Sequence, residues 1–245
     1  MPANKKTGRG SLKTLKSLHG KERLRYLWDY FKLPLLLICI LLYIIIYSAY
    51  RHITYREPVL YTALVNVDAG EALTKQLSED FLAAADADPS KETFHLYTKL
   101  YLTDDENSSY HEYTYGSRMK ILASIESQML DVVLMDKEAF DAFAQNGYLC
   151  DIDKLLSKEA PDLYEDVRSF IVENTYIKED NASDVVLDPS VEYSAVTESY
   201  PMGLDMSKAG IIKQAGFEEP VYLGIISNSP RMDTALKYIR YLLSE

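Results

Sequence analysis

Residues Met119–Leu156 read MKILASIESQMLDVVLMDKEAFDAFAQNGYLCDIDKLL, and their pattern sets the expected fold class. Apolar side chains recur at helical spacing over Ser117–Leu130, which predicts a helix with one buried stripe. Asp131–Met135 (DVVLM) is then a short apolar run, typical of a buried strand. A second helix is predicted over Lys137–Asn146, with Gly147 at a position that commonly ends helices. The stretch therefore predicts a helix–strand–helix unit of an α/β protein.

The same alternation continues on both sides of this unit. Leu60–Val67 (LYTALVNV) predicts a buried strand, and helical spacing follows over Glu71–Ala85. Phe94–Leu102 alternates apolar and polar residues, as a half-buried strand does. Val221–Ser227 (VYLGIIS) predicts a last strand, followed by a helix with Pro230 at its first position. We therefore expect an α/β domain with a mainly parallel sheet flanked by helices.

Other segments carry weaker signals. Thr103–Tyr115 is polar and rich in tyrosine, which indicates a loop or an edge hairpin. Its tyrosines and their neighbours suit a sugar or peptide site, a partner interface, or simply an exposed strand face. Asp162–Glu173 has a helical pattern, whereas Val185–Leu187 and Val191–Val196 have short apolar runs that favour strands.

A long uncharged run precedes the domain. Leu33–Tyr50 (LPLLLICILLYIIIYSAY) has 18 residues without a charge. A helix of that length spans about 27 Å, close to the hydrocarbon thickness of a bilayer. A cleaved signal peptide is the alternative, but its apolar core is usually shorter, roughly 7–15 residues. The run therefore predicts a permanent transmembrane helix in contact with the lipid bilayer through residues 33–50.

The charge on either side of the run predicts its orientation. Residues 1–32 hold nine of the 26 basic residues but two of the 37 acidic ones. Lys and Arg stay on the cytoplasmic side of a membrane span. We expect a basic cytoplasmic tail at 1–32, the transmembrane helix at 33–50, a tether at 51–58 and an extracytoplasmic domain at 59–245. The protein would then be a single-pass protein of the cell membrane, with its C-terminal domain outside.

The sequence lacks the common catalytic and cofactor motifs. It has no H-E-x-x-H zinc motif and no G-x-S-x-G nucleophile turn. It also has neither a Walker A motif nor a G-x-G-x-x-G motif, the glycine-rich loops that bind the phosphates of nucleotides. Cys39 and Cys150 are the two cysteines, one in the apolar run and one expected in the core. We expect no catalytic residues, no metal site, no cofactor and no enzymatic activity. The acidic excess after residue 32 also argues against nucleic acid as a partner.

Two stretches resemble the extracellular solute-binding proteins of ABC importers. In that family a helix leads to a D-V-V strand, a helix with an aromatic residue, and a G-x-L-x-D-L-D segment. The matching residues here are Asp131-Val132-Val133, Phe140 and Gly147–Asp153 (GYLCDID). Gly224–Ser244 (GIISNSPRMDTALKYIRYLLS) is similar to the family's closing strand, N-S turn and helix. The resemblance covers about 60 residues in all.

The resemblance implies a periplasmic-binding-protein lobe, a small polar solute such as a sugar or peptide, and a membrane transporter as partner. Family members usually have two lobes, so this domain resembles a reduced, membrane-anchored form. The anchor region (YLWDYFKLPLLL, then LYTALVNV) also resembles uncharacterised membrane-anchored proteins of Firmicutes.

Candidate ligand residues follow the predicted strands, because ligands of open α/β sheets bind beyond the carboxyl ends of the strands. They are Asn66, Asp68, Asp136, Ser227 and Asn228, each able to form hydrogen bonds with a polar solute. The same residue types also form turns and cap helices. The sequence thus favours a solute-binding module that acts with a membrane transporter. The alternative is a ligand-free structural or assembly subunit of a membrane complex.

Overall fold

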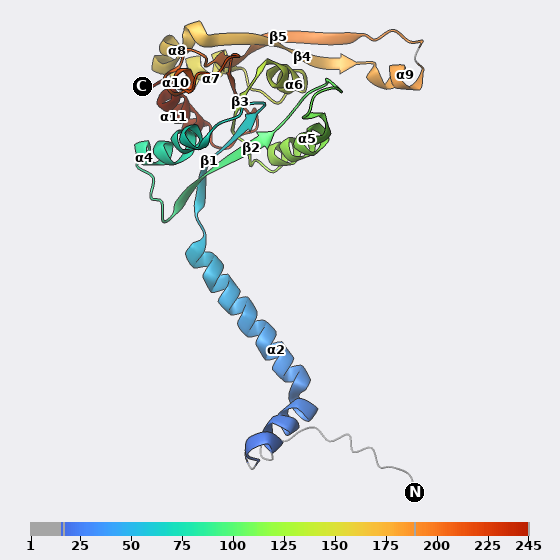
Figure 1. Ribbon diagram of the computed structural model, residues 1–245, viewed down its shortest axis with the longest axis vertical. Coiled ribbons are helices and arrows are strands. Elements are labelled where there is room, and N and C mark those ends of the chain that lie inside the picture. Colours follow the sequence, from blue (N-terminus) through green and yellow to red (C-terminus); the bar gives the residue numbers. More distant parts are fainter. Residues whose placement is uncertain (1–15, 17, 189, 245) are drawn as a thin grey trace. The chain divides into compact units, whose positions relative to one another are not determined.

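The computed structural model describes residues 16, 18–188 and 190–244, and the chain divides into two compact units, Met1–Tyr55 and Arg56–Glu245 (Figure 1). The first unit is built on helix α2, Gly20–Thr54. Within α2, Lys32–Thr54 is long and apolar enough to cross a membrane, judged by length and composition. The predicted span at 33–50 falls inside it, whereas half of the predicted tail at 1–32, residues 1–15 and 17, lies outside the described residues.

The predicted tether at 51–58 is shorter in the structure. Helix α2 continues through Thr54, and strand β1 begins at Glu57, so Tyr55 and Arg56 are the two residues between these elements. Arg51 and His52 lie in the last turn of α2, where basic side chains interact favourably with the helix dipole. This is a physical reason for the helix to extend past the apolar run.

The second unit contains one six-stranded sheet, in the order β2-β1-β3-β6-β5-β4. Strand β1 is parallel to both β2 and β3, whereas the β3–β6, β6–β5 and β5–β4 pairs are antiparallel. The predicted α/β class with flanking helices is confirmed, but the sheet is mixed rather than mainly parallel. The strands are β1 (Glu57–Val65), β2 (Glu92–Leu100), β3 (Val132–Met135), β4 (Ile171–Asp180), β5 (Ala195–Asp205) and β6 (Tyr222–Ile225).

The direction of β6 follows from its connections. After β3 the chain forms four helices over residues 137–170 and then the β4–β5 hairpin before it enters β6. In β6, Ile225 pairs with Val132 and Tyr222 pairs with Met135, so the two strands run in opposite directions. A fully buried apolar strand has the same residue pattern in either direction. The sequence therefore reveals the strand but not its orientation.

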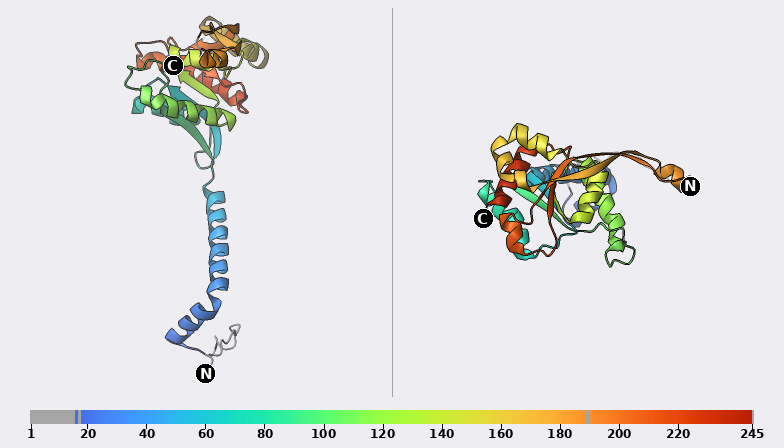
Figure 2. Two further views of the ribbon diagram at one scale, coloured as in Figure 1. Left: turned by 90° about the vertical axis from the view of Figure 1, so that its right-hand side faces the viewer. Right: turned by 90° about the horizontal axis from the view of Figure 1, so that it is seen from above.

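Helices cover both faces of the sheet (Figures 1 and 2). On one face, alternate β1 residues such as Leu60 pack against the helices that lie within residues 71–84, 152–167, 210–215 and 232–243. On the other face, Ala63 and Val65 of β1 pack against helices α5 and α6. The helices are α3 (Glu71–Lys75), η1 (Gln76–Asp80), α4 (Phe81–Ala84), α5 (His111–Glu126), α6 (Lys137–Gln145), α7 (Ile152–Glu159), α8 (Pro161–Val167), η2 (Arg168–Phe170), α9 (Ala182–Leu187), α10 (Gly210–Ala215) and α11 (Met232–Leu243).

Several weak predictions are corrected. Helix α5 begins at His111, so the second part of the predicted loop at Thr103–Tyr115 is helical. The segment predicted as one helix, Asp162–Glu173, ends as a helix at Val167 and enters β4 at Ile171. Val185–Leu187 lies in α9, and β5 begins only at Ala195. These segments are largely exposed or half-buried, so their sequences lack the periodic spacing of apolar residues that core contacts produce.

The first turn of the last helix also differs from the prediction. Helix α11 begins at Met232, and Pro230 precedes it rather than occupying its first position. The Ser229 hydroxyl accepts a hydrogen bond from the Arg231 N–H (3.1 Å), which forms a local turn before the helix. The Ser229 hydroxyl also donates to the buried Asp131 carboxylate, so Ser229 is held in place by the core.

Candidate functional site

The ends of β1 and β3 bring two predicted site residues together. These strands are parallel, and Val65 at the end of β1 pairs with Met135 at the end of β3. The next residues, Asn66 and Asp136, therefore lie side by side. The Asn66 amide nitrogen Nδ2 lies 3.1 Å from each carboxylate oxygen of Asp136.

Asn66 also joins β1 to the segment beyond β2. Its Nδ2 donates to the Leu102 carbonyl (2.7 Å), and its Oδ1 accepts from the Leu102 N–H (2.8 Å). Its backbone has a φ of 58°, a left-handed conformation that asparagine tolerates better than most residues. The described contacts thus use both ends of the Asn66 amide within the protein.

Asp136 has a structural task as well. It is the N-cap of α6, and its Oδ1 accepts from the Ala139 N–H at 2.8 Å. Burial raises the pKa of the Asp136 carboxyl, and the nearby Glu138 and Glu219 carboxylates raise it further. The hydrogen bonds from Ala139 and Asn66 act in the opposite direction. A positive charge beside Asp136 would therefore relieve an unfavourable ionised state.

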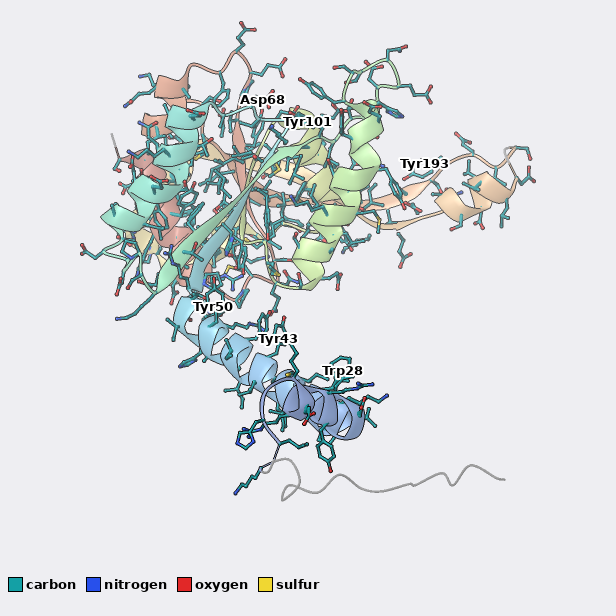
Figure 3. All side chains as sticks on the ribbon, turned by 60° about the horizontal axis from the view of Figure 1, so that its bottom comes forward. Trp28, Tyr43, Tyr50, Asp68, Tyr101 and Tyr193 are labelled. Atoms are coloured by element: carbon teal, nitrogen blue, oxygen red, sulfur yellow. The ribbon has the colours of Figure 1, made fainter. Side chains whose placement is uncertain are left out.

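Asp68 lies next to an aromatic cluster. The Tyr101 hydroxyl donates to its Oδ1 at 3.1 Å, and Figure 3 shows both residues at one edge of the sheet. The Tyr101 ring stacks on Tyr110 with centroids 4.1 Å apart and lies 6.3 Å from the Tyr113 ring. Burial raises the pKa of the Tyr101 hydroxyl, and its hydrogen bond to Asp68 raises it further. Tyr101 thus contributes a polar contact to this edge, and the tyrosine-rich segment Thr103–Tyr115 packs against its ring through Tyr110.

Asn66, Asp68 and Asp136 all line one small cavity of about 240 Å³, which we call the acidic pocket. Residues 217–221, between α10 and β6, close its other side. Four of its lining side chains are acidic, and the described lining includes no basic side chain. The full lining is Asn66, Val67, Asp68, Asp136, Phe217, Glu218, Glu219, Pro220 and Val221.

Ser227 and Asn228 lie elsewhere. Because β6 is antiparallel to β3, its end lies at the start of β3 and not at the edge that holds Asn66. The Ser227 N–H donates to the Tyr148 carbonyl at 2.9 Å, and the Asn228 Nδ2 donates to the Ile125 carbonyl at 3.0 Å. The structure therefore brings three of the five predicted site residues together and places these two at the opposite edge.

A buried aspartate that is not among the predicted site residues organises this opposite edge. Asp131 is fully buried and accepts from the Tyr61 N–H (2.8 Å), the Ser229 hydroxyl (2.6 Å) and the Arg231 Nε (2.8 Å). The Arg231 guanidinium lies 4.8 Å from the centre of the Tyr61 ring and also donates to the Gln128 carbonyl. In the sequence, the one signal for this residue is an isolated acid at the start of an apolar strand. The network ties β1, β3 and the start of α11 together.

Comparisons with known proteins found similarity to solved structures only. Among the described residues, no group of three or more His, Cys, Asp or Glu side chains could hold a metal ion. No protein-family model matches the chain, and no curated protein matches it. The fold is similar to the solved structure of a periplasmic binding protein, AttC of Agrobacterium tumefaciens strain C58, in an open unliganded conformation. The TM-score is 0.34 and the identity 11%, over 78% of this chain and 80% of that one.

Proposed function

We propose that the protein is a membrane-anchored, extracytoplasmic binding module whose acidic pocket holds a small, positively charged solute. The convergence of Asn66, Asp68 and Asp136 on one pocket at the carboxyl ends of β1 and β3 carries this proposal. Open α/β sheets bind ligands at such edges. Four acidic side chains around about 240 Å³ favour an amine or a short basic peptide over a neutral sugar.

The anchor supports a partner in the membrane. Helix α2 has the length and composition of a membrane span, and Tyr55 and Arg56 alone separate it from β1. Two residues extend over at most about 7 Å. A short link of this kind suits a module that passes its solute to a membrane transporter, with the basic residues of 1–32 on the cytoplasmic side.

A thermal-shift experiment on the full chain in detergent tests the proposal. The probes are the dipeptide Lys-Lys and its fully acetylated, neutral counterpart. At a concentration of about 100 times Kd, a ligand adds about 2.7 kcal/mol of stability. For a unit of this size that is a rise in Tm of about 5–10 °C.

The variant Glu218→Gln/Glu219→Gln supplies the matched control, because both side chains are exposed and line the pocket. We expect Lys-Lys to stabilise the wild type, the variant to respond much less, and the acetylated probe to have no effect. Equal shifts with both probes, or an undiminished shift in the variant, would rule out the acidic pocket as the binding site.

The second candidate function is a ligand-free assembly subunit of a membrane complex. The hydrogen bonds of Asn66 and the helix cap made by Asp136 favour it, because these side chains already have partners within the protein. A complete lack of stabilisation by cationic, anionic and neutral solutes, together with stable co-purification of a membrane complex, would support this reading over solute binding.

A further inference from the structure

The hairpin of β4 and β5 forms a projecting arm. The strands pair from Ile171–Leu204 at the base to Asp180–Ala195 at the far end. Ten residues of strand rise about 30 Å. Helix α9 lies at the far end, and Figures 1 and 2 show that this end stands away from the rest of the unit. We call residues 179–188 and 190–197 the arm tip.

The arm tip combines exposed apolar side chains with negative charge. Val186 is 82% and Leu187 84% exposed, and Tyr193 and Val196 are also exposed. Figure 3 shows Tyr193 on the projecting arm. Five acidic residues and no basic one occur in this segment: Glu179, Asp180, Asp184, Asp188 and Glu192. A surface of this kind suits a partner with an apolar floor and a basic rim.

A cavity at the base of the arm has these complementary properties. It measures about 710 Å³, and we call it the basic pocket. Apolar side chains from α8, η2 and α11 line it, together with three cations and one acid. The lining is Leu163, Asp166, Phe170, Lys208, Ala209, Gly210, Lys213, Gln214, Arg240, Leu243 and Ser244.

Two of the cations are available for a partner. Arg240 pairs with Asp162, with 2.6 Å between Nη2 and Oδ2. Within the described residues, neither Lys208 nor Lys213 forms an ion pair, although the domain around them is strongly acidic. Basic side chains gathered at an apolar cavity thus form a local exception to the charge of the domain.

The geometry points to a second copy of this chain as the partner. We infer that the arm tip of one copy docks in the basic pocket of the next. A copy cannot fill its own pocket, because Phe170 lines the pocket and directly precedes β4, so the pocket lies at the base of the arm and the tip about 30 Å away. Figures 1 and 2 show α9 and α11 at opposite ends of the unit.

The contact is heterologous, because different surfaces of the two copies meet. Such contacts build rings or open chains rather than isolated dimers. Anchoring copies in one membrane would raise their effective concentration, which favours even a weak contact between them. The inference does not depend on the acidic pocket, because none of that pocket's residues takes part.

Photo-crosslinking of the full chain in its membrane tests the inference. The photoreactive residue p-benzoylphenylalanine replaces Leu187 at the arm tip, or Tyr115 on α5, which is 76% exposed, as the control. We expect crosslinked dimers and higher multiples from position 187, with peptides that contain residues 208–213 or 240–244. The control position should give none of these products.

Charge exchange makes the test specific. The variant Lys208→Glu/Lys213→Glu should lower the crosslinking yield about tenfold or more, and adding Asp184→Lys/Glu192→Lys should restore it. All four side chains are exposed, and an unchanged Tm verifies that each variant folds. Crosslinks from position 187 only to other proteins, or only to other segments of this chain, would overturn the inference. A yield that is insensitive to the charge reversal would overturn it as well.

Discussion

Replacing Asp131 with alanine should be among the most damaging single changes in the second unit. The carboxylate is fully buried and accepts hydrogen bonds from Tyr61, Ser229 and Arg231. Removing one partner of a buried ion pair leaves the other charge unpaired, which costs about 3–5 kcal/mol. For a unit of 150–250 residues, each kcal/mol lowers Tm by roughly 2–4 °C, so we expect a fall of about 6–20 °C.

The matched control is an exposed ion pair of similar length. Arg118 and Asp104 lie 2.6 Å apart, and both side chains are more than half exposed. Asp104→Ala should cost less than about 1 kcal/mol, because solvent screens such pairs. Thermal and urea denaturation of the full chain in detergent, followed by circular dichroism, measures both variants. If Asp131→Ala unfolds within 2 °C of Asp104→Ala, the buried network is not the stabilising feature that its geometry indicates.

Three further predictions concern a thiol and two glycines. Burial raises the pKa of the Cys150 thiol to about 12. In a Cys39→Ser variant at pH 8, Cys150 should therefore react with a disulfide reagent roughly a thousandfold more slowly than a free cysteine. A fast reaction of the folded protein would contradict this prediction. At Gly203 an added Cβ would lie 2.7 Å from the Leu223 carbonyl oxygen, so Gly203→Ala should cost about 1–3 kcal/mol in urea denaturation. Gly116 in α5 has open space around it, and Gly116→Ala should instead stabilise by about 0.5–1 kcal/mol; a loss there would count against the assignment of α5.

The parts of the fold that could be predicted are those with a buried pattern. β1, β3 and β6 are apolar because helices cover both faces of the sheet there, and an unbroken apolar run indicates a buried strand. β4 was missed because Ile171–Asp180 is half-buried or exposed and lies at the sheet edge. Strand pairing supplies its stability, and pairing between distant segments leaves no local signal.

The candidate site was predicted in part for the same reason. Asn66 and Asp136 follow parallel neighbouring strands, so their convergence could be expected from the sequence. Ser227 and Asn228 follow an antiparallel strand, and no local pattern shows that direction. The buried network of Asp131 could not be predicted, because its three donors come from positions 70 to 100 residues away.

The arm has a consequence for how the second unit opens. Asn174 donates to Asp141 of α6 at 2.8 Å, and the Tyr176 ring packs closely on Gly147, but Lys178 and most residues of the arm tip are exposed. An isolated two-stranded hairpin is marginally stable in water. The distal arm should therefore unfold locally while β1 and β3 stay folded. This local unfolding would allow its amide hydrogens to exchange and proteases to cleave it. A protease could then remove the end of the arm and leave the folded core of the unit intact.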